Sequence, residues 1–144
     1  MNPWLFAHLF FLGIWAGCVA VEMVIEFYGR KEIGKQHQTA QLHYLIDLCV
    51  EIPVLIMVLA SGMMLFDASK LTVPYYKLKI IMGFIPIGIN ALCVIPVALR
   101  KKAADRSDEP VMKRNTKWIF AAFYSGFAAA LVALGIGMHF LGIF

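Results

Sequence analysis

The chain carries few charges for its 144 residues: only 15% are Asp, Glu, Lys or Arg, whereas 61% are hydrophobic. An ordinary soluble domain is about 25% charged and about 45–50% apolar. This shortage of charge excludes an ordinary soluble domain, and the length leaves no room for a large soluble module. The mean hydropathy of +0.76 is likewise higher than that of an ordinary soluble domain. The composition therefore indicates an integral membrane protein whose principal partner is the lipid bilayer.

Cysteine is also scarce, and no cleavable leader is expected. Cys18, Cys49 and Cys93 all fall in apolar segments, are odd in number and lack the spacing of a metal site. We interpret them as small apolar side chains. The first apolar segment is too long for a signal peptide and has no basic leader, so we expect it to remain as a membrane helix. A nucleic-acid partner is not expected, because the basic residues cluster at the ends of apolar segments.

Four apolar segments are long enough to cross about 30 Å of hydrocarbon, which takes about 20 residues. Lipid cannot hydrogen-bond the backbone, so continuous apolar segments of this kind form helices. The sequence predicts an all-α fold: an integral membrane four-helix bundle in one transmembrane domain, residues 1–144. The expected helices span 3–28, 42–66, 73–99 and 118–144. Pro53, Pro86 and Pro96 lie inside these segments, where each removes a backbone donor and is expected to bend its helix.

Basic residues gather in the first and third connections between these helices, and the second has only Asp67 and Lys70. The basic residues are Arg30, Lys31 and Lys35 in the first connection, and Arg100, Lys101, Lys102, Arg106, Lys113, Arg114 and Lys117 in the third. The positive-inside rule makes their side cytoplasmic and leaves both termini on the periplasmic side. We expect a multi-pass protein of the bacterial inner (cytoplasmic) membrane. Because four helices bury little, a homo-oligomer or a partner in a membrane redox complex is expected.

Two histidines lie at matching depths near the two chain ends. His8 and His139 each sit about 8 Å inside the mouth of their helix, at 1.5 Å per residue. Imidazoles inside a membrane are usually functional, and a facing pair suits axial ligation of the iron of haem b. Lys79 lies at a similar depth, where its ammonium group can pair with a propionate. In the alternative interpretation, His139 only forms hydrogen bonds at the membrane–water interface, and the Lys79 side chain only extends to the lipid headgroups.

A second set of ionisable residues lies deeper toward the basic side. Its members are Glu22, Glu26, His43, Asp47 and Glu51. Such side chains are costly against lipid, so we expect them to face the bundle interior. Neighbouring carboxylates cannot all ionise, which favours a proton relay through Glu22, His43, Asp47 and Glu51. Two alternatives remain: a divalent metal site, although the EXXH pairs of di-iron bundles are absent, and a structural cluster at the interface neutralised by Arg30 and Lys35.

Three short motifs resemble the HemJ-type protoporphyrinogen oxidases and the CopD-like copper-resistance membrane proteins. They are WLFAHLFFLGIWAG around His8, EIPVLIMVLASGMMLF at Glu51–Phe66 and YYKLKIIMG at Tyr75–Gly83. The resemblance covers three of the four helices. It implies that His8 is associated with haem b and that Lys79 is a functionally important, catalytic lysine.

We therefore expect a membrane protein with b-type haem, bound by His8 and His139, that carries out electron transfer or oxidoreduction. It would act as a porphyrinogen-oxidase-like enzyme or as a subunit of a larger redox complex. The protein would set the haem potential through its ligands, burial and hydrogen bonds. Two other classes stay open: a small membrane transporter or metal-handling protein that uses the polar side chains on the inward faces of the helices, and a structural subunit that contacts a larger partner.

Overall fold

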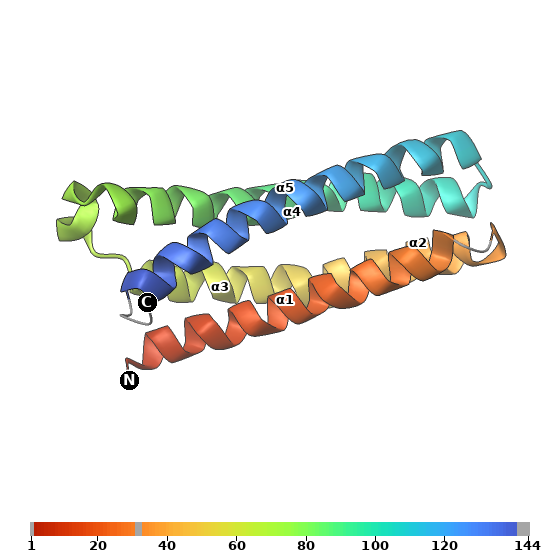
Figure 1. Cartoon of the computed structure of the whole chain (residues 1–144). Helices are drawn as coiled ribbons and strands as arrows, with labels where there is room; N and C mark the ends of the chain where they lie inside the picture. The colour runs from red at the N-terminus through yellow and green to blue at the C-terminus, as the bar shows by residue number, and fades with distance from the viewer. Residues whose placement is uncertain (1, 31–32, 141–144) are drawn as a thin grey trace.

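The computed structural model describes residues 2–30 and 33–140, and this part consists of four helical rods side by side (Figure 1). The rods are α1 (Pro3–Arg30), a composite second rod, α4 (Pro74–Asp105) and α5 (Glu109–Phe140). The second rod joins α2 (Gln36–Ile46), the π-helical turn η2 (Asp47–Glu51) and α3 (Ile52–Met64). All four rods are long and apolar enough to cross a membrane. The predicted all-α, four-helix membrane fold is confirmed.

Short connections give the bundle two distinct ends. The start of α1, the end of α5 and the 3₁₀ turn η3 (Ala68–Thr72) lie at one end, called the terminal end below (Figure 1). The 3₁₀ turn η1 (Ile33–Lys35) and the tight turn between α4 and α5 lie at the other, called the loop end. At the start of η3, Asp67 accepts hydrogen bonds from the Ser69 amide and hydroxyl, which lower the pKa of that carboxyl.

The helices run further than hydropathy predicts. The second rod begins at Gln36 instead of 42, α4 continues to Asp105 instead of 99, and α5 begins at Glu109 instead of 118. Hydropathy marks the part of a helix that lies in lipid, whereas Lys, Arg and Ala are good helix formers beyond it. The connection between α4 and α5 is therefore only a few residues. Lys31 in the first basic connection and the predicted last turn, 141–144, lie outside the described residues.

The prolines act differently from one another. Ahead of Pro53 the chain forms the π-helical turn η2, in which the Ile52 amide donates to the Asp47 carbonyl five residues back. A proline ring crowds the carbonyl four residues before it, and a π turn is one way to relieve that crowding. In α4, by contrast, the helix continues through both Pro86 and Pro96.

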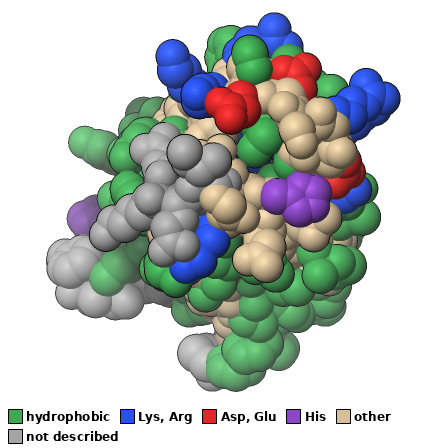
Figure 2. All heavy atoms as spheres, turned by 90° about the vertical axis from the view of Figure 1, so that its right-hand side faces the viewer, with side chains coloured by type: hydrophobic (Ala, Val, Ile, Leu, Met, Phe, Trp, Pro, Cys, Tyr) green, Lys and Arg blue, Asp and Glu red, His purple; other side chains and the backbone are tan. Residues whose placement is uncertain are grey.

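The distribution of side chains is reversed relative to a soluble protein. Large hydrophobic residues such as Val24 and Leu92 are 68% and 66% exposed, whereas Glu51 and Arg100 are 2% and 3% exposed. Figure 2 looks onto the loop end, where charged side chains gather while hydrophobic side chains cover the flanks. The exposed apolar flanks fit contact with lipid, and the interior holds charged and polar side chains together with apolar ones.

Gly29→Ala is expected to destabilise the protein by about 1–3 kcal/mol, because it overpacks the contact between α1 and α2. A Cβ atom at Gly29 would overlap the buried side chain of Thr39, whose β-branching leaves it little freedom to move. Thermal unfolding in detergent micelles measures the effect. Gly13→Ala is the matched control, since nothing lies within 4 Å of a Cβ there. Equal stability of the two variants would contradict the prediction.

Candidate functional site

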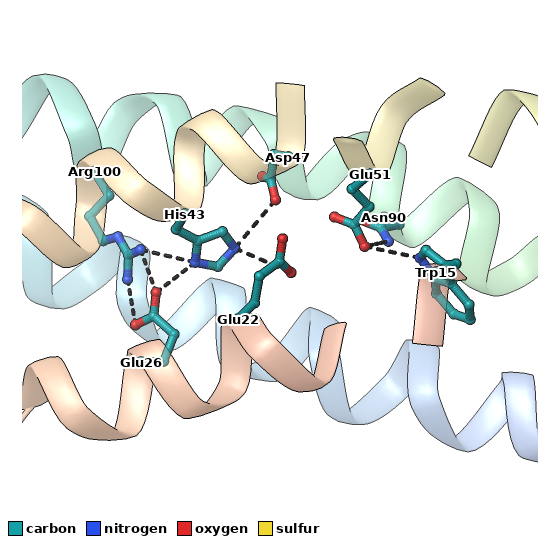
Figure 3. A network of polar contacts seen from close by, with 8 residues as sticks. All are labelled: Trp15, Glu22, Glu26, His43, Asp47, Glu51, Asn90 and Arg100. Atoms are coloured by element: carbon teal, nitrogen blue, oxygen red, sulfur yellow. Dashed lines mark hydrogen bonds and ion pairs between the residues drawn. The ribbon is translucent and has the colours of Figure 1, made fainter. Parts of the chain in front are cut away.

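Ionisable side chains fill the interior of the bundle toward its loop end (Figure 3). Six are buried, each no more than 7% exposed: Glu22, Glu26, His43, Asp47, Glu51 and Arg100. They come from α1, the second rod and α4. The expectation that the five predicted members face inward is confirmed, and Arg100 is an addition. We call these six residues the polar core.

Helical periodicity explains why the polar core forms. On the second rod, His43, Asp47 and Glu51 are spaced four apart, and on α1 Glu22 and Glu26 have the same spacing. Residues four apart lie on one face of a helix. The π turn η2 begins at Asp47 and ends at Glu51, and both side chains are buried. The two faces meet, so that the carboxylates of Glu22, Asp47 and Glu51 interact electrostatically with one another.

A bidentate ion pair closes the polar core on the loop-end side. The two Arg100 terminal nitrogens donate to Glu26, Nη1 to Oε2 at 2.7 Å and Nη2 to Oε1 at 2.5 Å. The Nδ1 atom of His43 lies 2.6 Å from the same Oε1 atom. A carboxylate held by a guanidinium group is ionised and accepts hydrogen bonds, so Nδ1 of His43 carries the proton and donates it to Glu26.

The prediction that Arg100 belongs to the basic connection is wrong. Arg100 lies inside α4, seven residues beyond Cys93. A step of seven residues, about two turns, stays on the same face of a helix, so Arg100 lies on the face of α4 that includes the half-buried Asn90 and Cys93. Extending this stripe past the end of the apolar segment would have found the residue.

The other ring nitrogen of His43 points at two carboxylates. Its Nε2 atom lies 3.4 Å from Asp47 Oδ1 and 3.8 Å from Glu22 Oε2 (Figure 3). The buried atoms Asp47 Oδ1 and Glu22 Oε1 have no hydrogen-bond partner. One ligand atom from each of the three residues lies within 4.8 Å of the other two. Within the described part of the chain, no other group of three or more His, Cys, Asp and Glu residues has its ligand atoms this close together.

Glu51 joins three rods at the far side of the polar core. Its Oε1 atom accepts hydrogen bonds from Trp15 Nε1 at 2.9 Å and from Asn90 Nδ2 at 2.5 Å (Figure 3). Trp15 comes from α1 and Asn90 from α4. The carboxylate is thus an acceptor for two half-buried donors, whatever further role it has.

Nearer the terminal end, His8 is held in a defined orientation by α3. Its Nδ1 atom lies 3.1 Å from the Val58 carbonyl oxygen and 3.1 Å from Ser61 Oγ. The Ser61 hydroxyl donates to the Met57 carbonyl, and a carbonyl can only accept. Nδ1 of His8 therefore carries the proton, and in the neutral ring Nε2 has the free lone pair. Gly62 lies against the ring: a Cβ there would be 3.1 Å from His8 Cε1.

The two other residues predicted to join His8 come from α4 and α5. Lys79 of α4 lies over Gly137 of α5, its Cε atom 3.4 Å from where a Cβ would stand. The exposed ring of His139 contacts the neighbouring Phe140. Among the described residues, no hydrogen bond or ion pair joins His139 to His8.

An open cavity of about 310 Å³ leads from the loop end to the polar core. It reaches Glu26 and Arg100, and its rim includes Lys113 and Lys117 of α5. Water and small ions therefore have a route to the ion pair that closes the polar core.

Comparison with protein-family models, with curated proteins and with solved structures gives no match for this chain. Any function assigned to the chain therefore rests on the geometry of its described residues.

Proposed function

We propose that the chain is a membrane b-type haem protein for electron transfer or oxidoreduction, with His8 as an axial ligand. The observation that carries this proposal is the hydrogen bond from His8 Nδ1 to the Val58 carbonyl. Metal-ligating histidines commonly donate their second ring N–H to a carbonyl or carboxylate, which fixes the tautomer and orients the ring. His8 is held in this manner, with Nε2 available as the ligand atom.

The surroundings of His8 fit a haem in two further respects. Gly62 and Gly137 lack side chains beside His8 and Lys79, which leaves the approach to both unobstructed by a Cβ. Lys79 supplies a positive charge for a propionate. When bound, the haem supplies a one-electron redox centre, and the protein tunes its potential through ligand and burial. A porphyrinogen-oxidase-like reaction with Lys79 as a catalytic residue is one activity within this proposal.

The proposal includes location and partners. The basic loop end is assigned to the cytoplasm by the positive-inside rule, which places His8 near the periplasmic face of a bacterial inner membrane. An electron-transfer protein of this size needs a donor and an acceptor, so we include a second copy or a redox partner. The relay through Glu22, His43, Asp47 and Glu51 stays a prediction. On the second rod, the buried apolar residues Leu55 and Val58 lie between Glu51 and Ser61, the residue that contacts His8.

Visible absorption of the purified protein, expressed with haem supplied, tests the proposal. The wild type is expected to show a Soret band, and His8→Ala is expected to lose it because the variant removes the proposed axial ligand. His37→Ala is the matched control, since His37 is exposed near the loop end. A wild type without a Soret band, or an unchanged band in His8→Ala, would refute it. A low-spin to high-spin change in His139→Ala would identify the second ligand.

A further inference from the structure

We infer that Glu22, His43 and Asp47 bind one divalent first-row metal ion in the interior of the bundle, separate from His8. This inference does not depend on the haem. The three side chains come from α1 and the second rod, and each is at least 93% buried, with exposed fractions of 7%, 4% and 3%. The site would connect the two rods across the interior, where a metal ion is shielded from lipid.

The spacing of the ligand atoms suits a metal ion. Metal–ligand bonds of about 2.0–2.2 Å place neighbouring ligand atoms about 3–3.5 Å apart. The His43 Nε2 atom lies 3.4 Å and 3.8 Å from the two carboxylate oxygens, and the whole set lies within 4.8 Å. These separations are too long for good hydrogen bonds and need only a small contraction to close around an ion.

The charges of the polar core also call for a cation at this point. His43 Nδ1–H donates to Glu26, and in the neutral form of this ring the lone pair of Nε2 points toward two carboxylates. Asp47 Oδ1 and Glu22 Oε1 are buried without a hydrogen-bond partner. Arg100 is the one buried Arg or Lys among the side chains that the structure describes, and it is engaged by Glu26. A divalent ion would balance the carboxylates that Arg100 does not reach.

The groups around the three ligands match those of metal sites. A carboxylate that accepts from the distal nitrogen of a ligating histidine raises its basicity and orients its ring. Glu26 takes this position 2.6 Å from His43 Nδ1, and Arg100 in turn holds Glu26. One imidazole with two carboxylates favours Mn²⁺, Fe²⁺ or Zn²⁺ over Cu(I), which prefers sulfur ligands. The cavity at the loop end provides an entry route as far as Glu26.

Titration of the full-length protein with Co²⁺ tests the site. The protein, purified in detergent and stripped of metal with a chelator, is expected to bind one Co²⁺ per chain with visible ligand-field bands. Asp47→Asn is expected to weaken Co²⁺ binding at least about 100-fold. This is more than the loss of affinity expected when a residue that only hydrogen-bonds to a metal ligand is replaced. Glu51→Gln is the matched control: a neighbouring buried carboxylate becomes an amide, but the side-chain oxygen can still accept from Trp15 and Asn90. It is expected to retain the ion.

Co²⁺ binding and the Soret band are separate measurements, so failure of the metal-site inference can be distinguished from failure of the haem proposal. No bound Co²⁺ in the wild type, or equal affinity in wild type and Asp47→Asn, would overturn the inference. Nitrogen NMR of the wild type with Zn²⁺ gives a measurement without any variant: a His43 ring protonated on Nδ1 alone, whose Nε2 resonance shifts when Zn²⁺ is added, supports the site. Protons on both ring nitrogens would show an imidazolium ion instead and overturn it. His8→Ala is expected to bind Co²⁺ as the wild type does, whatever its Soret band.

Discussion

Arg100→Met is expected to lower the free energy of unfolding by about 3–5 kcal/mol, the usual cost of leaving one partner of a buried ion pair uncompensated. The side chains of Arg100 and Glu26 are 4% and 3% exposed, and two hydrogen bonds join them. Methionine fills much of the volume of arginine but brings no charge, so Glu26 would keep only the bond from His43. Denaturation in mixed detergent and lipid micelles measures the loss.

Two comparisons separate the charge from the packing. The double variant Glu26→Gln, Arg100→Met is expected to recover most of the stability, because it removes both charges while the glutamine oxygen still accepts from His43 Nδ1. Lys102→Met changes an exposed basic residue of the same helix and is expected to have little effect. A double variant as unstable as Arg100→Met alone would show that packing, and not the unpaired carboxylate, explains the loss.

Glu51→Leu is expected to cost about 2–4 kcal/mol, because it leaves two donors without an acceptor at about 1–3 kcal/mol each. Trp15 Nε1 and Asn90 Nδ2 both donate to Glu51 Oε1, and neither has another hydrogen-bond acceptor among the described residues. Both donors are half-buried, which favours the lower part of the range. The same denaturation measurement applies, and a double variant with Asn90→Leu is expected to lose less than the sum of the two single variants.

Glu51→Gln is the control that keeps the acceptor. Its side-chain oxygen can occupy the place of Oε1, so the stability is expected to stay within about 1 kcal/mol of the wild type. If Glu51→Gln were as unstable as Glu51→Leu, the ionised carboxylate itself, and not its role as an acceptor, would be what stabilises the bundle.

The losses of stability expected for Arg100→Met and Glu51→Leu have one cause: buried polar groups hold the rods together. Lipid removes the hydrophobic driving force between membrane helices, so packing and interhelical hydrogen bonds remain. Glu26 with Arg100 joins α1 to α4, and Glu51 joins α1 and α4 to the second rod. The polar core therefore has a structural role in addition to the functions proposed for it.

Much of the fold and of the polar core could be predicted from the sequence because the relevant signals are local. Hydropathy over about 20 residues identifies four spans, and spacing of four places His43, Asp47 and Glu51 on one face. The cost of charge in lipid then requires that face to turn inward, which the burial of all three confirms. These steps need no knowledge of which helix lies beside which.

The partners of these side chains were decided only by the tertiary structure. Arg100 and Glu26 are 74 residues apart in the chain, and His8 and Ser61 are 53 apart. Such pairs depend on the rotation and relative height of helices, which periodicity alone does not determine. For the same reason the tautomer of His8, the distance of His139 from it and the convergence of Glu22, His43 and Asp47 depend on how α1, the second rod and the hairpin of α4 and α5 pack together.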